Sequence, residues 1–414
     1  MSAIIVSDAS RILTDWEMAE TSEVWQRLDR PTPESVEAVC QALSLSAFAE
    51  RIELPGDPQW IAHSVDSESK SLLLYTLGGQ RLAGLASFFV HPSTLRLALG
   101  ELTFLSRPVR RLTAFAPPIV DAAGSRERER DLLSALLVRI RADLAPDEAL
   151  FFEGVPEETA FFELLQAPEI RRCGFYALRF GKLFHHRFAT VPEGYESYLR
   201  NLGARTRSDL RSTRKKFYAH VGDSGRIRCF RDPSEVGEFL SDATAISRKT
   251  YQHRLLGAGL RDPGKLERRY RSTAELGWFR SYVLYAGKEP VAFQVGHVYR
   301  GTFHAQEIGY DPEWARYHVG ILLHTEILMD LSTGASGVKR FDFGNDDSLH
   351  KQRLSTDSRR EGYFYLIPAT LRGAIMAKSM HATNGASAAL GAILGRFGAR
   401  RRVRDFFRRL GVNR

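Results

Sequence analysis

The chain has 414 residues, of which 43% are hydrophobic and 26% charged, and its formal net charge is +9. These values are typical of a soluble globular protein, and the length favours two or three domains. Its three cysteines, Cys40, Cys173 and Cys229, lie far apart and lack the spacing of metal ligands. The composition therefore argues against a disulfide framework and against a zinc or redox centre, and we expect no metal.

The N-terminus and the apolar runs of the chain indicate in which compartment the protein acts. The N-terminus, MSAIIVSDASRILTD, lacks the basic segment followed by an apolar segment that secretory signals have. No apolar run approaches the ~20 residues that a membrane span requires. We therefore expect a cytoplasmic protein, and peripheral contact at the inner membrane stays open.

The first half of the chain predicts a hairpin, then a helix, then a strand. The hairpin is LLLYTLGGQRLAGLASFFV, which begins at Leu72 and turns at Gly78 and Gly79. The helix is RERERDLLSALLVRIRADL, and the strand is EALFFEGV. A strand-like YALRFGKL then stops near HRFATVPEGYE, where we place the end of a first domain of residues 1–185.

The second half repeats this plan. SYVLYAGKEPVAFQVGHVY, which begins at Ser281, is a hairpin with its turn at Gly287, and GILLHTEILMDL and VKRFDF follow as helix and strand. We therefore predict a mixed α/β fold of two tandem domains, residues 1–185 and 186–370, each with a mixed β-sheet flanked by helices. Two halves that share a general architecture without common descent would give the same pattern.

A basic helix is predicted ahead of the second hairpin. ARTRSDLRSTRKKF, residues 204–217, has Leu210 and Phe217 among its few apolar anchors. The planar guanidinium groups of Arg207 and Arg211 suit bidentate contacts with phosphate or carboxylate, so both are candidate substrate-binding residues. An exposed helix face with nothing bound fits the same pattern.

The stretch from Glu307 to Lys351 is the most informative part of the chain, because it predicts a strand, a polar turn, a helix, a strand and an acidic loop. The strand TFHAQEIGY ends before Pro312, since proline cannot continue a central ladder. Gly320 opens the helix, whose apolar residues recur at near-helical spacing, and Gly334 follows its end as C-cap glycines do.

The start of that helix predicts an anion site. The first backbone N–H groups of a helix are unpaired and carry the positive end of its dipole, and Gly320 lets a ligand approach them closely. Arg316 and His318 add side-chain donors, so the predicted phosphate cradle consists of Arg316, His318, Val319 and Gly320. The alternative is that Gly320 only starts a buried helix and Arg316 is solvated.

Asp342, Phe343 and Gly344 spell the magnesium-binding triplet of protein kinases. A kinase also needs a GxGxxGxV loop, a VAIK-type lysine strand and an HRD loop, and the chain has none of these. The triplet therefore does not indicate a kinase.

Three blocks in this order resemble the CelD-type proteins of the GNAT acyltransferase superfamily: RTRSDLRSTRKKF, GYDPEWARYHVGILLHTEIL and FDFGNDDSLHK. RLTAFAPPIVDAAG and ALFFEGVPEET resemble the first half of the same family, so the resemblance covers residues 40 to 370. It implies two tandem GNAT-like domains, acyl-coenzyme A as the co-substrate with no tightly bound cofactor, and an amine or saccharide-linked acceptor, often in cellulose synthesis. The first half lacks an equivalent of the Asp342–Lys351 loop, so we expect it to be degenerate.

The resemblance also assigns residues in the acidic loop. Asp347 and Lys351 match the family pattern, which makes them candidate substrate-binding residues. Asp346 and His350 stand where the pattern has a glycine and a tyrosine, so the shape of the loop and its phenolic proton donor differ from the family.

Acyl transfer to an amine requires a group that removes a proton, because amines with a pKa near ~10 are mostly charged at neutral pH. Glu307 and Asp342 are the first candidates, since they lie on neighbouring predicted strands. Tyr310 and Tyr317 are within reach as proton donors. The alternatives are a solvent-facing Glu307, an Asp342 that caps or pairs with an arginine, and tyrosines that only pack.

The last residues, 371–414, predict a helical basic tail. GRFGARRRVRDFFRRLGVNR carries eight arginines against Asp405 alone, and its apolar residues fall on one helical face. Arg400–Arg409 could therefore contact a membrane surface or a protein partner, and a solvated or self-docked tail fits equally.

Three functions fit these patterns. The first is an acyl-coenzyme A dependent acyltransferase acting on a small-molecule or saccharide-linked acceptor. The second is a FemAB-like aminoacyl-tRNA-dependent transferase, although no aromatic-interleaved basic sheet or long inserted helical hairpin indicates nucleic-acid binding. The third is an inactive scaffold whose basic tail docks on a membrane or a partner.

Overall fold

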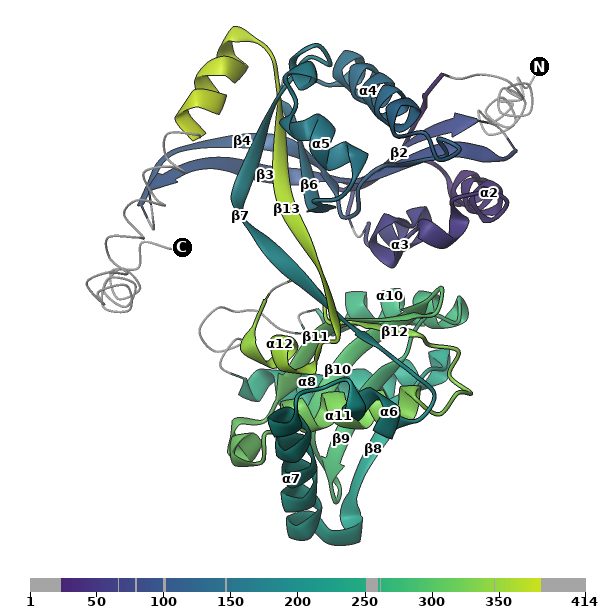
Figure 1. Cartoon of the computed structure of the whole chain (residues 1–414), viewed down its shortest axis with the longest axis vertical. Coiled ribbons are helices and arrows are strands. Elements are labelled where there is room, and N and C mark those ends of the chain that lie inside the picture. Colours follow the sequence, from purple (N-terminus) through teal and green to yellow (C-terminus); the bar gives the residue numbers. More distant parts are fainter. Residues whose placement is uncertain are drawn as a thin grey trace, which may run out of the picture. The chain divides into compact units, whose positions relative to one another are not determined.

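The computed structural model describes residues 24–380, except residues 66, 79, 100, 101, 146, 251–259, 261 and 346, and leaves the side chains of 96–105 and 107 undescribed. The chain forms two compact units. Unit 1 runs to Leu183 and resumes at Glu361, and unit 2 is Phe184–Arg360 (Figure 1). Within the described residues, no helix is long and apolar enough to cross a membrane.

Unit 1 is a mixed sheet with helices against it. Its strands follow the order β1-β2-β3-β4-β6-β13, and β5 pairs with β3. Its elements are β1 (Gln26–Asp29), α2 (Pro33–Ser44), α3 (Pro58–Ala62), β2 (Ser71–Gly78), β3 (Leu82–Leu99), β4 (Leu102–Ala114), β5 (Ile119–Val120), α4 (Arg126–Asp143), β6 (Glu148–Pro156), α5 (Ala160–Gln166), β7 (Phe175–Thr190) and β13 (Asp357–Pro368). Residues 371–380 form a further helix after β13.

Unit 2 repeats the arrangement with the strand order β12-β11-β10-β9-β8, and the end of β7 pairs with β12. Its elements are α6 (Tyr195–Arg200), α7 (Ala204–Val221), β8 (Gly225–Phe230), α8 (Val236–Lys249), α10 (Pro263–Glu275), β9 (Ser281–Ala286), β10 (Glu289–Tyr299), β11 (Thr302–Tyr310), the 3-10 helix η6 (Pro312–Tyr317), α11 (Val319–Leu331), β12 (Arg340–Asp342) and α12 (Leu349–Leu354).

The predicted fold class, a mixed α/β fold with helices flanking the sheets, is confirmed. Both hairpins form, β2 with β3 and β9 with β10, and the strand predicted as TFHAQEIGY is β11. The basic helix is α7, with Leu210 and Phe217 as its buried residues. The predicted second domain ran to residue 370, whereas unit 2 ends at Arg360 and Glu361–Leu366 of β13 pair with β6 in unit 1.

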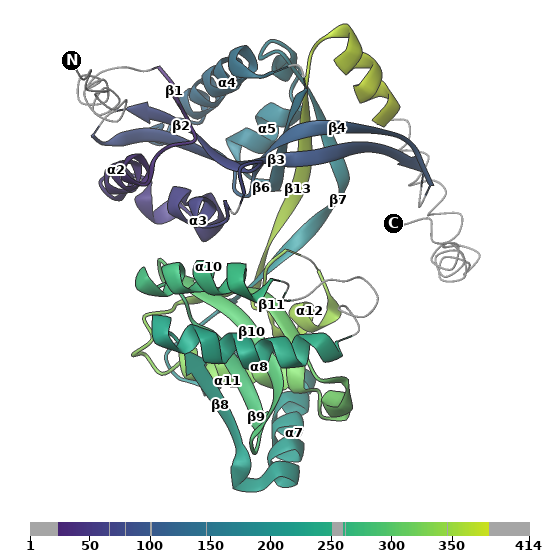
Figure 2. The same ribbon diagram turned by 180° about the vertical axis from the view of Figure 1, so that it is seen from behind.

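The two faces of the unit 2 sheet are covered by different helices. Val283, Phe293 and Val295 pack with α8 and α10 in one apolar cluster, and Figure 2 looks onto these helices. Phe303, Phe341 and Ala292 pack with α11, α7 and α6 in another cluster on the opposite face (Figure 1). Successive residues of a strand point to opposite faces, so β9 and β10 supply side chains to both clusters.

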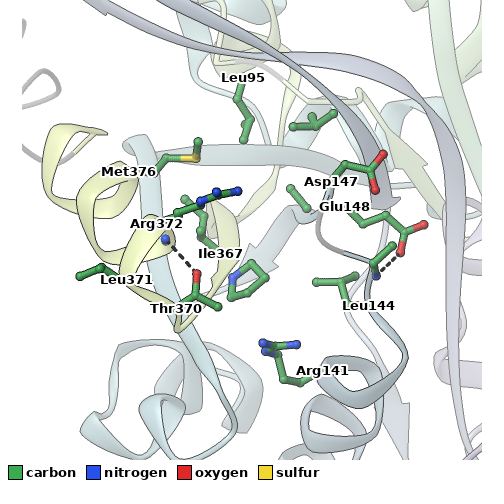
Figure 3. Close-up of a pocket in the computed structure, with 15 residues that line it drawn as sticks. Leu95, Arg141, Leu144, Asp147, Glu148, Ile367, Thr370, Leu371, Arg372 and Met376 are labelled. Atoms are coloured by element: carbon green, nitrogen blue, oxygen red, sulfur yellow. Dashed lines mark hydrogen bonds between the residues drawn. The ribbon is translucent and has the colours of Figure 1, made fainter.

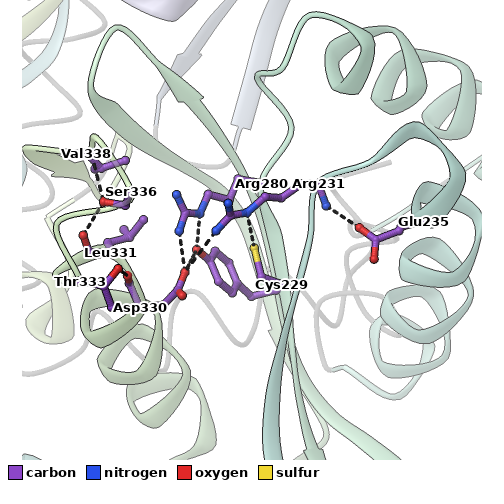
Figure 4. Close-up of polar contacts among 10 residues, drawn as sticks. Cys229, Arg231, Glu235, Arg280, Asp330, Leu331, Thr333, Ser336 and Val338 are labelled. Carbon is purple, nitrogen blue, oxygen red and sulfur yellow. Dashed lines mark hydrogen bonds and ion pairs between the residues drawn. The ribbon is translucent and has the colours of Figure 1, made fainter.

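Helix α11 is held in place along its length. Near its end, Asp330 accepts hydrogen bonds from Arg280 Nη2 at 2.6 Å and from Tyr282 Oη at 2.7 Å (Figure 4). One turn earlier, the buried Glu326 pairs with Arg214 of α7 at 2.8 Å. These contacts tie α11 to β9 and α7, so the position of its first turn is fixed.

Candidate functional site

The parallel pair β11 and β12 opens into a fork. Their pairing runs from Thr302 and Arg340 to His304 and Asp342 and stops there, whereas β11 continues to Tyr310. Pairing of β11 with β10 also shifts register just beyond this point, between Gln294 and Gly296, which marks a β-bulge. Bulges bend a strand and re-aim its side chains, so the bulge and the end of pairing together separate the two strands.

The predicted anion cradle lies at the start of α11. His318 adopts a left-handed conformation (φ 50°, ψ 41°), provides no side-chain cap for the helix, and is exposed. The first turn of α11 contains no acidic residue, and a Cβ at Gly320 would come within 3.4 Å of Tyr310. The first N–H groups of the helix therefore face no competing side-chain oxygen of the cap or the first turn.

A cavity of about 550 Å³, here named the larger cavity, lies beside this helix start. Residues from β11, η6 and α11 line it, among them Ile308, Tyr310, Ala315 and Ile321. Most of the lining is apolar, and His318, His324 and His350 supply its imidazole groups. An elongated, uncharged part of a ligand suits such a chamber.

A second cavity of about 280 Å³, here named the smaller cavity, shares His318, Ile321 and His350 with the larger one. Its cations are Lys216 of α7, Arg316 of η6 and Arg353 of α12. The two cavities therefore meet at the start of α11, one mostly apolar and the other basic.

The predicted substrate-binding arginines of α7 do not line either cavity. Arg207 donates to the carbonyl of Leu202, and Arg211 forms an exposed ion pair with Glu196 at 2.8 Å. The α7 residue that brings positive charge to the smaller cavity is Lys216. Lys216 was not among the predicted residues, because the sequence gives no register for α7 against α11.

Asp342 lies at the last paired position of the fork and is 7% exposed. His186 Nε2 donates to one carboxylate oxygen at 2.6 Å, His304 Nδ1 donates to the other at 3.1 Å, and the Gly344 N–H adds a bond of 2.8 Å. Burial alone would raise the pKa of Asp342, but the two histidines hold it well below its usual range. Asp342 is thus a carboxylate that orients imidazole groups.

Glu307 lies within the bulged part of β11 and is half-buried, and burial raises the pKa of its carboxyl group. Burial raises the pKa of Tyr270 on α10, and the nearby charge of Glu307 raises it as well. His304 pairs in register with His297, whose Nε2 bonds Thr273 on the same helix at 3.1 Å. Glu307 and His304 therefore belong to the α10 face of the fork, and the cavities to the α11 face.

The remaining predicted residues are distributed around these features. Tyr310 is 44% exposed and lines the larger cavity, whereas Tyr317 lines the smaller one and stacks on His220 at 4.9 Å. Asp347 pairs with Arg187 at 2.8 Å. Lys351 is buried, and its Nζ donates to the Gly344 carbonyl at 3.2 Å, which fixes the loop after Asp342.

Five residues of the site were not among the predicted ones: His186, Lys216, His304, His324 and Arg353. His304 and His324 lie inside the predicted strand and helix, where a histidine usually only packs. His186 lies on β7, 156 residues from its partner Asp342, so no local pattern joins them. Within the described part of the chain, no group of three or more metal-ligating side chains is placed to hold a metal ion.

Sequence comparison identifies part of the chain. Residues 204–352 match the family model described as the acetyltransferase (GNAT) domain. This segment contains α7, the fork, the acidic loop and the whole lining of the larger cavity, together with the lining of the smaller cavity except Arg353 and Leu354. No curated protein matches the chain in sequence.

Comparison with solved structures gives the fold. The crystal structure of FemX aligns with a TM-score of 0.54 at 10% identity, covering 82% of this chain and 96% of FemX. The C-terminal domain of a putative lysylphosphatidylglycerol synthetase from Agrobacterium fabrum has a TM-score of 0.49 at 12% identity, covering 86% and 96%. A tandem GNAT protein from the clavulanic acid biosynthesis pathway has a TM-score of 0.44 at 10% identity, covering 84% and 99%. The chain therefore has a GNAT-like fold.

Proposed function

We propose that the protein is an acyltransferase that moves an acyl group from acyl-coenzyme A to an amine or hydroxyl group, with unit 2 as the active unit. The observation that carries this proposal is the meeting of an apolar and a basic cavity at the uncapped start of α11. Coenzyme A combines a long uncharged arm with a phosphorylated nucleotide, and these two cavities have the corresponding chemistry.

The donor would be held by three features. The pyrophosphate accepts hydrogen bonds from the first N–H groups of α11 beside Gly320. Lys216, Arg316 and Arg353 of the smaller cavity supply charge for the nucleotide phosphates. The pantetheine arm occupies the larger cavity and brings the thioester to the fork, where no ladder of hydrogen bonds closes the sheet.

At the fork, the acceptor nitrogen or oxygen forms a bond with the thioester carbonyl carbon, and the carbon–sulfur bond breaks. The acceptor loses a proton to a base, and coenzyme A leaves as a thiolate that takes up a proton. His304 suits the role of base, because its Nδ1–H donates to Asp342 and its Nε2 retains a lone pair. In this arrangement Asp342 is a positioning residue, as the carboxylate of a catalytic triad is.

Glu307 is the second candidate for the base. Burial raises the pKa of its carboxyl group, which makes it a better proton acceptor than an exposed glutamate. Tyr310 lines the larger cavity and could protonate the leaving thiolate, although a thiolate with a pKa near ~8.5 does not require it.

Titration calorimetry with coenzyme A tests the donor. We expect Lys216→Ala and Arg316→Ala to weaken binding on the order of tenfold each, since each removes a cation from a phosphate. Arg211→Ala is the matched control on α7, because its partner is Glu196 at the surface, and it should bind as wild type does. Absence of coenzyme A binding by the wild-type protein would refute the proposal.

A FemAB-like aminoacyl-tRNA-dependent transferase is the second candidate, and the fold similarity to FemX is the observation that favours it. Its test is tRNA binding. A steep loss of affinity with added salt, without any binding of coenzyme A, would replace the first proposal by this one.

Three finer predictions stay open. A CelD-type subfamily and a polysaccharide-linked acceptor, including cellulose synthesis, rest on the sequence resemblance alone. Arg400–Arg409 lie outside the described residues, so a membrane or partner contact of the tail remains a prediction. Deleting residues 395–414 should reduce binding to anionic vesicles and leave turnover unchanged if the tail is an anchor.

A further inference from the structure

His324 is a buried imidazole in the wall of the larger cavity. It is 3% exposed, and its ring meets Phe341 and Phe343 edge-on and stacks on His350. A histidine in this position must satisfy both ring nitrogens inside the protein, or leave one without a partner.

One nitrogen is satisfied by Gln294. The Gln294 amide nitrogen donates to the carbonyls of Val295 at 2.8 Å and Glu307 at 3.2 Å, so its oxygen is the free acceptor. His324 Nε2 lies 3.0 Å from that oxygen and therefore carries the proton. The same amide thus joins His324 to the backbone at the bulge of the fork.

The other nitrogen is left as an acceptor. Within the described part of the chain, His324 Nδ1 is buried and has no hydrogen-bond partner. Burial, and then the charges of His350 and Lys351, lower the pKa of His324 to about 3, so the ring is neutral and Nδ1 keeps its lone pair. A buried acceptor without a donor is destabilising, and a donor on a bound ligand would recover that loss.

We propose that an amide N–H or hydroxyl of the pantetheine arm donates a hydrogen bond to His324 Nδ1, so that His324 aligns the arm in the larger cavity. This inference rests on the proposed function and gives it a residue that recognises the pantetheine arm.

Two matched ligands test the contact with His324. Coenzyme A contains the pantetheine arm, and adenosine 3′,5′-bisphosphate contains only the nucleotide end. His324→Gln keeps a nitrogen donor near Gln294 and removes the acceptor at Nδ1, so it should weaken coenzyme A binding on the order of tenfold and leave the bisphosphate unchanged. Equal losses for both ligands, or no loss for either, would overturn the inference.

The failure of this inference and the failure of the proposed function are distinguishable. If the wild-type protein binds coenzyme A and His324→Gln binds it equally well, only the inference fails. If the wild-type protein does not bind coenzyme A, the proposed function fails as well.

Nitrogen NMR of the wild-type protein gives an answer even if His324→Gln does not fold. The Nδ1 resonance of His324 should be that of an unprotonated nitrogen that accepts a new hydrogen bond when coenzyme A is added. Adenosine 3′,5′-bisphosphate should leave this resonance where it is. An Nδ1 that does not respond to coenzyme A at saturation would overturn the contact.

Discussion

The two units build the same strand, helix and strand, but a different strand extends beyond the parallel ladder in each. In unit 1, β4 pairs with β6 as far as Ala114, its last residue, and β6, the strand after the helix, continues to Pro156. In unit 2, β12 ends with the ladder at Asp342, and β11, the strand before the helix, continues for six residues after His304. Only in unit 2 does the projecting end belong to the strand before the helix, and there Ile308 and Tyr310 line the larger cavity.

The N-termini of α4 and α11 also differ between the two units. In α4, the Ser125 side chain caps the Arg128 N–H, and Glu127 and Glu129 place negative charge in the first turn. In α11, the His318 side chain makes no cap and the first turn has no acid. An anion is therefore favoured at α11 and opposed at α4.

The helix ends are alike. Asp143 of α4 accepts from Tyr75 of β2 at 3.2 Å, as Asp330 of α11 accepts from Tyr282 of β9 at 2.7 Å. The cavity of about 460 Å³ in unit 1 also lies at this end of α4, where Leu144, Ile367 and Met376 line it (Figure 3). The two units therefore share a scaffold, and the proposed ligand site depends on the other end of the helix.

The largest expected effect is on turnover. His304→Ala and Asp342→Asn should each lower the rate of coenzyme A release about 10²–10⁴-fold with an amine that the wild-type protein accepts, because the first removes the proposed base and the second its orienting carboxylate.

The control for turnover lies on the unit 1 sheet. His91 bonds Thr113 at 3.2 Å, and His91→Ala should leave the rate unchanged if only unit 2 is active. Loss of activity in Glu307→Gln with full activity in His304→Ala would reassign the base to Glu307.

The ion pairs near the ends of α11 and α4 should differ in how much they contribute to the free energy of unfolding. Arg280 is buried and pairs with Asp330 at 2.6 Å, whereas Asp330 is half-buried and also accepts from Tyr282. Arg280→Ala removes a charged hydrogen bond and should lower the free energy of unfolding of unit 2 by about 1.5–3 kcal/mol. Arg139, whose pairing with Asp143 is exposed, is the matched residue of unit 1, and Arg139→Ala should cost about 0.5 kcal/mol. Urea titrations measure both, and equal losses would contradict the difference in burial.

One substitution should make the start of α11 resemble that of α4. Gly320→Glu introduces a carboxylate into the first turn and should weaken coenzyme A binding more than tenfold in calorimetry, through repulsion of the phosphates. Gly320→Ala adds bulk without charge, and its Cβ would meet Tyr310 at an ordinary 3.4 Å. It should therefore lose less affinity for coenzyme A than Gly320→Glu. Glu127→Gln in α4 should change nothing.

The smallest effect is a dependence of stability on pH. The pKa of His324 is about 3 in the folded protein and about 6.5 in an unfolded chain, so the unfolded state binds the extra proton between these values. Unit 2 should therefore lose about 1 kcal/mol of stability as the pH falls from about 6.5 to about 5.5. In His324→Gln, this dependence of the free energy of unfolding on pH should disappear. The same dependence in the variant and the wild-type protein would show that the His324 ring is already protonated.

The sequence alone determined the elements and their repetition. Alternating strands, turn glycines and the helical run after Gly320 are local patterns, and β11 and α11 formed where those patterns indicated. The basic helix α7 and the cradle beside it were also local features. Residue types within a few positions of one another decide such elements, so no tertiary contact was needed to find them.

Only the tertiary structure decided which side chains work together. His186 reaches Asp342 from a strand 156 residues away, Lys216 and not Arg207 or Arg211 lines the smaller cavity, and His324 has one ring nitrogen paired and the other without a partner. Strand register, helix rotation and burial set these relations, and they depend on contacts between segments that are far apart in the chain. The fork also depends on the tertiary structure. The point at which β11 and β12 stop pairing is set by both strands together and cannot be read from the sequence of either one.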